Sequence, residues 1–130
     1  MILEALIAIL IFSIGILGLV GTLSASVSNA SEAQYRTEAA FFAESLIGEL
    51  RVANPATRAI DYASPSGASF VAWKTKITSG SAALPGSALS ANAPDVAFSS
   101  ANNRTVLVTI RWQAKNGSQA RQYIVQTALE

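Results

Sequence analysis

The sequence predicts an α+β fold in which a long N-terminal helix packs on a small C-terminal antiparallel sheet. An uncharged apolar run fills residues 5–23, and a helical pattern continues from it to residue 53. Near the other end, two segments with strand periodicity flank an Asn-Gly pair. The 130 residues suffice for one domain with a core and leave no room for a second large one.

The composition excludes several classes of function. The chain is 51% hydrophobic and 13% charged, which excludes a disordered protein. It contains no cysteine and no histidine, so disulfides, thiolate chemistry, the usual general base and the commonest metal ligand are excluded. A net charge of +1 gives no bulk attraction to nucleic acid or an anionic membrane. We therefore expect no catalytic residue, no cofactor and no metal site.

Residues 1–23 have the composition of a membrane span. As a helix, the nineteen uncharged residues 5–23 would measure about 28 Å, close to the thickness of a bilayer's hydrocarbon core. A cleavable secretory signal begins with positive charge, whereas Glu4 is the only charge before the run and Arg36 is the first basic residue. A buried helix would need enclosure on all sides, which a domain of this size hardly provides. We therefore predict that this half of the helix spans a membrane.

Residues 24–53 continue the helix as an amphipathic stem. An apolar stripe recurs there every three or four residues, formed by Tyr35, Ala39, Phe42, Leu46 and Leu50. Asn54-Pro55 ends the pattern, because the residue before a proline is disfavoured in a helix. We expect one helix of about fifty residues, on the order of 80 Å long.

After the helix, the sequence predicts a loop and then a sheet region. Residues 54–69 are rich in small and polar residues and include two prolines, which is typical of a connecting loop. Residues 70–130 are expected to form the sheet region. Alternation of apolar or β-branched residues with other residues predicts a first strand over 70–78, through Val71, Trp73, Thr75 and Ile77. Leu84-Pro85-Gly86 predicts a turn, and Val96 with Phe98 a short strand.

The clearest local pattern is a hairpin. Residues 104–114 and 119–129 flank Asn116-Gly117, a pair typical of a type I′ turn with positive φ at both residues. A two-residue loop would place Lys115 opposite Ser118 and so fix every other pair. The predicted pairs are Trp112 with Arg121, Ile110 with Tyr123, Val108 with Val125, Arg111 with Gln122 and Thr109 with Ile124. The first three make an apolar face, for which the stem around Phe42 and Leu46 is the only cover long enough.

Two features of the apolar helix bear on function. Glu4 is costly inside hydrocarbon, yet near a helix N-terminus at a membrane edge it can stay hydrated and gain from the helix dipole. A functional role would require Glu4 to meet a cation in apolar surroundings, and the first turn offers only its own α-amino group or a neighbour's.

Gly15, Gly18 and Gly21 each weaken a helix by about 1 kcal/mol relative to alanine, so they are candidates for softening the helix. Close packing of helices is the alternative explanation for these glycines.

The opening residues 1–8, Met-Ile-Leu-Glu-Ala-Leu-Ile-Ala, resemble the start of processed type IV pilins and type II secretion pseudopilins. Residues 41–46, the Trp73 segment, the Leu84-Pro85-Gly86 turn and residues 105–112 resemble PilV-type minor pilins. The basic leader of such proteins is expected to have been removed. Relatives usually carry one more residue before the glutamate, so either the first residue is missing here or the processing site is shifted.

The resemblance implies a pilin-like fold and a structural role, not an enzyme. A PilV-type minor pilin is cleaved and N-methylated by a prepilin peptidase, held in the bacterial inner membrane by a single pass, and then assembled with other pilin subunits into a surface filament. It is thought to act in filament initiation and adhesion. The residues expected to serve subunit assembly are Glu4, Met1, Leu6, Leu10 and Ile14. Those expected to soften the helix in the filament are Gly15, Gly18 and Gly21.

Other functions are less well supported by the residues. A major pilin or a secretion pseudopilin would share the same N-terminal pattern. We do not expect nucleic acid as a partner, because Trp112 is assigned to the core and leaves no exposed aromatic beside the basic residues of the last third. Asp61 and Asp95 are isolated and too few for a calcium site. A single-span receptor would differ by remaining in the membrane.

Overall fold

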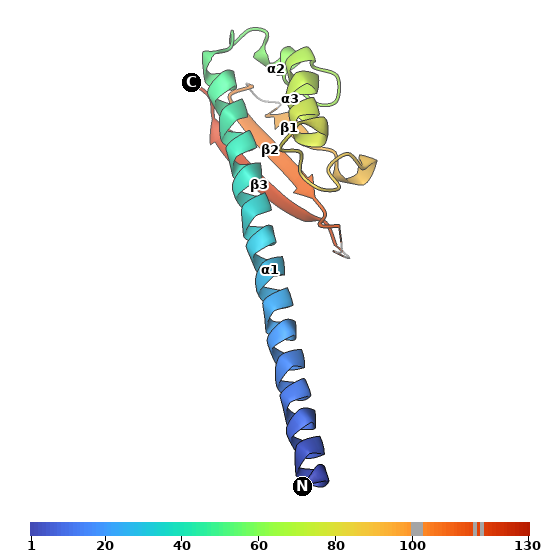
Figure 1. The fold of residues 1–130 in the computed structure, drawn as a ribbon. Helices are drawn as coiled ribbons and strands as arrows, with labels where there is room; N and C mark the ends of the chain where they lie inside the picture. The colour runs from blue at the N-terminus through green and yellow to red at the C-terminus, as the bar shows by residue number, and fades with distance from the viewer. Residues whose placement is uncertain (100–102, 116, 118) are drawn as a thin grey trace. The chain divides into compact units, whose positions relative to one another are not determined.

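The computed structural model describes residues 1–99, 103–115, 117 and 119–130. Its elements are α1 (Ile2–Val52), α2 (Arg58–Asp61), α3 (Ala68–Ser79), the 3-10 turn η1 (Ser90–Asn92), β1 (Asp95–Phe98), β2 (Thr105–Trp112) and β3 (Arg121–Ala128) (Figure 1). The predicted α+β, pilin-like fold is confirmed, because a 51-residue helix packs against a three-stranded antiparallel sheet. The chain divides into two compact units, Met1–Gln34 and Tyr35–Glu130.

Helix α1 ends where the sequence predicted. Its last residue is Val52, and the Ala53 N–H still donates to the Glu49 carbonyl at 3.0 Å. The side-chain oxygen of Asn54 then accepts the Ala56 N–H at 3.0 Å, which turns the chain away from the helical path ahead of Pro55. The predicted loop over 54–69 contains one helical turn, α2.

The stem of α1 contributes the predicted stripe to the core. Ala39, Leu46 and Leu50 are fully buried, while Tyr35 and Phe42 are partly buried against the same cluster. Two further residues of the stem, Ala43 and Ile47, are also buried. They follow Ala39 at four-residue steps, so the buried side of the helix is broader than the single stripe read from the sequence.

The sheet has the order β1-β2-β3 and the predicted hairpin register. Trp112 lies opposite Arg121, Ile110 opposite Tyr123 and Val108 opposite Val125, as expected. On the other face, Arg111 lies opposite Gln122 and Thr109 opposite Ile124, as expected. The short strand predicted around Val96 and Phe98 is β1, which pairs with β2.

The hairpin turn differs from the prediction. Among the described residues, positive φ occurs at Asn103 and Gly86 and not at Gly117, so a type I′ turn with positive φ at Gly117 is wrong. The paired strands end at Trp112 and begin again at Arg121, two residues short of the expected ends on each side. Beyond Trp112, the Gln113 N–H donates to the Pro85 carbonyl at 2.8 Å. Both strands lose the same number of residues to the loop, so the remaining residues keep the predicted partners. Asn116 and the expected Lys115–Ser118 pair lie outside the described residues.

The predicted strand over 70–78 is wrong, because this segment is helix α3. Its buried residues, Phe70, Trp73 and Ile77, are spaced by three and four and therefore share one side of a helix. Val71, which alternation placed with them, is 47% exposed. The hydroxyls of Thr75 and Thr78 donate to carbonyls four residues earlier, so these β-branched residues are accommodated in the helix.

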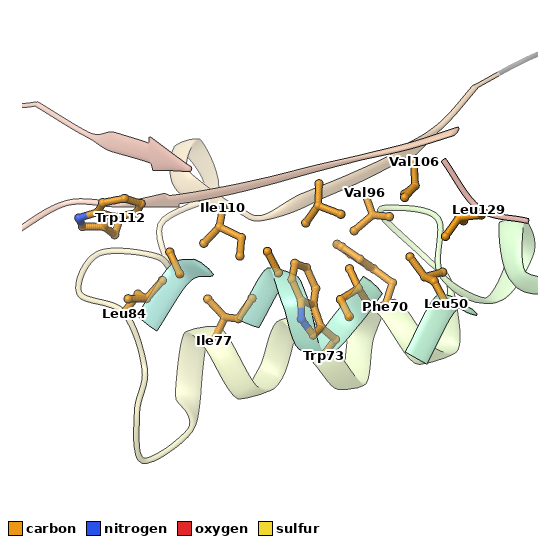
Figure 2. Packing of buried hydrophobic residues seen from close by; sticks show 14 residues of the cluster. Leu50, Phe70, Trp73, Ile77, Leu84, Val96, Val106, Ile110, Trp112 and Leu129 are labelled. Carbon is orange, nitrogen blue, oxygen red and sulfur yellow. The ribbon is translucent and has the colours of Figure 1, made fainter. Parts of the chain in front are cut away.

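Helix α3 shares the covering of the sheet with the stem, so the stem is not the only cover. Figure 2 shows Leu50 from α1, Phe70, Trp73 and Ile77 from α3, and side chains of the sheet in one cluster. The connection after α3 contains the predicted turn. Ser87 N–H donates to the Leu84 carbonyl at 3.3 Å, and Gly86 has φ of 68°, as in a type II turn with proline at its second position.

Candidate functional site

The surface of the unit Met1–Gln34 is the candidate site. Between Met1 and Val27, sixteen large apolar side chains are each at least 44% exposed. The helix is long and apolar enough to cross a membrane, and none of its most apolar window is buried. A contiguous exposed apolar surface of this kind marks a site that contacts lipid or other protein chains. Its extent all around the helix distinguishes it from the one-sided surface of an ordinary amphipathic helix.

Glu4 is the only ionisable side chain on this surface, because the next one in the sequence is Glu32. The Met1 carbonyl accepts the Ala5 N–H at 3.2 Å, which begins the helical ladder and places Glu4 in the first turn. The N–H groups of this turn have no partner within the helix, so a carboxylate is favourable here. Both Met1 and Glu4 are exposed. The arrangement presents one anionic group at the end of an apolar rod.

The predicted assembly residues do not all share one side of α1. Leu6, Leu10 and Ile14 follow one another at four-residue steps and lie along one side, each about 60% exposed. Glu4 stands two residues before Leu6 and therefore points away from that row. An assembly contact through Leu6 and one through Glu4 would thus involve different neighbours.

Glu4 shares its side of the helix with small residues that the sequence analysis did not single out as a row. Ala8, Gly15 and Thr22 are spaced by seven, and Gly18 stands between the last two. A Cβ placed on Gly15, Gly18 or Gly21 would meet nothing within 4 Å. Open space above small residues lets a second helix approach closely. The seven-residue spacing of Ala8, Gly15 and Thr22 was the signal that could have found this row.

The polar side chains within the apolar run are satisfied by the helix itself. Ser13 Oγ donates to the Ile9 carbonyl at 2.8 Å, and Thr22 Oγ1 to the Leu19 carbonyl at 2.9 Å. Neither hydroxyl therefore needs a partner outside the helix, which suits an apolar surrounding. The backbone through Gly15, Gly18 and Gly21 is continuous α-helix in this single chain.

Among the described residues, no group of three acidic, histidine or cysteine side chains is placed to hold a metal ion. No protein-family model, curated protein or solved structure matches the chain. What the molecule itself defines is a class of architecture. It is a pilin-like α+β protein with a long apolar N-terminal helix and a small antiparallel sheet.

Proposed function

We propose that this chain is a structural subunit of a type IV pilus, of the PilV-like minor class. The observation that carries the proposal is the exposed apolar half of α1, with one carboxylate in its first turn, joined to a unit that has its own core. The globular unit encloses its own core. The apolar half of the helix is exposed on all sides and needs a cover from outside, either lipid or other helices.

The two covers are energetically similar for such a helix. Lipid tails are about as apolar as leucine side chains, so moving the helix from a bilayer into a bundle of like helices changes its hydrophobic free energy little. The same segment can therefore anchor the subunit in the inner membrane and later form the core of a filament. Prepilin peptidase would act on the chain at the membrane, before assembly.

Glu4 can fix the axial position of one subunit relative to its neighbour, which an uncharged apolar surface cannot do. In a filament core, its carboxylate would be enclosed by apolar helices, and an unpaired buried charge costs several kcal/mol. The α-amino group of a neighbouring subunit is the available counter-charge. A wrong axial offset would leave both charges unpaired, so the pair selects the offset as well as attracting the neighbour.

Cell fractionation with quantitative mass spectrometry tests the proposal. We expect the chain both in the inner-membrane fraction and in filaments sheared from the cell surface, at a small fraction of the bulk subunit. Recovery from the membrane fraction alone would contradict assembly and would indicate a single-span membrane protein. An abundance equal to that of the bulk subunit would assign the chain as a major pilin.

A further inference from the structure

The outer edge of β3 is a row of backbone hydrogen-bonding groups. In the order β1-β2-β3, the eight-residue strand β3 has a neighbour on one side only. In an antiparallel ladder, alternate residues direct both N–H and C=O toward the neighbour, and those between direct theirs away. The Leu129 N–H donates to the Arg104 carbonyl, which makes this a bonded pair in the β2–β3 register. Counting back by twos, Gln122, Ile124 and Gln126 direct their backbone groups away from β2.

The two edges of the sheet differ in whether their outward backbone groups have hydrogen-bond partners. At the β1 edge, the Ser64 N–H donates to the Val96 carbonyl at 3.1 Å, and the Val96 N–H donates to Ser64 Oγ at 3.4 Å. At the β3 edge, no hydrogen bond within the described part of the chain engages the outward backbone groups of Gln122, Ile124 or Gln126. All three residues are exposed. Among the described residues, Ser64 therefore covers the outward backbone groups of Val96 in β1, and no comparable contact covers β3.

The β3 edge also lacks the features that usually prevent strand pairing. Proteins protect exposed edges with charged residues, proline, bulges or very short strands. β3 carries one charged residue, Arg121 at its start, and the remaining residues 122–128 contain no charge and no proline. The strand pairs with β2 along its whole length without a bulge. An exposed and regular edge with an uncharged run of this length is suited to accept another strand.

We propose that the outer edge of β3 binds an extended segment of a partner protein, which adds to the sheet as a fourth strand. Main-chain hydrogen bonds would provide affinity and the flanking side chains would provide selectivity. On the inner face, the added strand lies beside Tyr123 and Val125, which are partly buried against the core. On the outer face it lies beside Ile124, which is 51% exposed, and two neutral amides. The segment that fits has apolar residues at alternate positions and no charge at its centre.

A second copy of this chain fits the edge less well. Antiparallel pairing of two β3 strands requires a two-fold axis perpendicular to the sheet, which reverses the direction of one stem. Such a pairing would leave the stems of the two copies antiparallel, whereas an extended segment of another protein carries no such constraint. Parallel pairing would place glutamine amides beside Tyr123 and Val125. Pairing with the β1 edge of a second copy is obstructed by Ser64.

The probe is a blocked eight-residue peptide with the sequence of β3, added to the full chain in detergent micelles. In an antiparallel register centred on Ile124, it places valine beside Tyr123, tyrosine beside Val125 and isoleucine beside Ile124, pairs that favour strand association. We expect saturable binding to the protein. A peptide N-methylated at its two glutamines and isoleucine should not bind, whereas methylation of its tyrosine, valine and threonine amides should leave binding intact.

The matched protein variants are Ile124→Pro and Ile124→Ala. Proline at 124 removes an N–H that does not bond to β2, so the hairpin is retained while the edge is interrupted. We expect peptide affinity to fall about tenfold or more for Ile124→Pro and much less for Ile124→Ala, which keeps the amide.

Three results would overturn the proposal. They are no binding by the unmodified protein up to about 1 mM peptide, equal binding by Ile124→Pro and Ile124→Ala, and equal loss from the two methylated peptides. Disulfide-linked dimers of Ile124→Cys in membranes would show instead that a second copy occupies the edge. Each measurement is independent of filament incorporation.

Discussion

The indole Nε1 of Trp73 donates a hydrogen bond to the main-chain oxygen of Phe42 over 3.0 Å, and so joins α3 to α1. Trp112 is buried to the same degree, with 2% of its surface exposed against 1% for Trp73. Its Nε1, however, has no hydrogen-bond partner within the described chain. The two tryptophans therefore differ in one respect that a substitution can measure.

Trp73→Phe should lower the free energy of unfolding by about 1 kcal/mol more than Trp112→Phe does. Both substitutions remove similar apolar volume, but only the first removes a satisfied hydrogen bond, while the second removes an unsatisfied donor. Urea unfolding of the full chain in detergent micelles, followed by far-ultraviolet circular dichroism, provides the comparison. Equal losses would show that the Trp73–Phe42 bond contributes nothing net.

Gly86→Ala should destabilise the protein by about 1–2 kcal/mol, because φ at this position is 68° and favours glycine. The new Cβ would also stand 2.9 Å from the Gln113 carbonyl oxygen. Gly117→Ala is the control. Its Cβ would stand 3.3 Å from the Ala114 oxygen, and its φ is not in the left-handed region, so a smaller loss is expected. The reverse order in thermal unfolding would contradict the turn geometry described above.

Glu4→Gln and Glu4→Ala should both insert in the membrane, because the apolar run is unchanged, yet both should enter filaments poorly. A buried ammonium without its counter-charge costs several kcal/mol, so we expect the filament pool to fall by about tenfold or more. Glu44→Gln is the control, since it removes the same charge from an exposed position on the stem. Membrane and sheared-filament pools are compared for each variant. Normal incorporation of Glu4→Ala would mean that Glu4 is only an interfacial acid.

In an assembled filament, we expect α1 to stretch or unwind somewhere between Ser13 and Thr22. Replacing Gly15, Gly18 and Gly21 together by alanine should stabilise the helix by about 1 kcal/mol per site and reduce filament yield. Each new Cβ has open space in the single chain, so the monomer tolerates the change. Gly48→Ala, with equally open space, is the control in the stem. A filament structure with an unbroken hydrogen-bond ladder through this stretch would refute the expectation.

The error at residues 70–78 has a specific physical cause. Over nine residues, a period of two and a period of 3.6 can both be fitted to the same apolar positions, and Trp73 with Ile77 satisfies either. Phe70 decides between them, since it is buried on the same side as Trp73 three residues later. That fact depends on a second surface, the stem of α1, against which α3 packs. The sequence of the segment contains no information about that surface.

The apolar character of residues 5–23, the end of α1 before Asn54-Pro55 and the register of β2 with β3 were all determined by the sequence itself. Each depends on local rules, namely the length of an uncharged run, the steric effect of proline and the two-residue period of a strand. Tertiary structure alone decided that residues 68–79 are helical and that Ser64 bonds to Val96 at the β1 edge, while no described residue covers the β3 edge in the same way. These outcomes depend on contacts between segments far apart in the chain, where burial and unpaired backbone groups outweigh local preference.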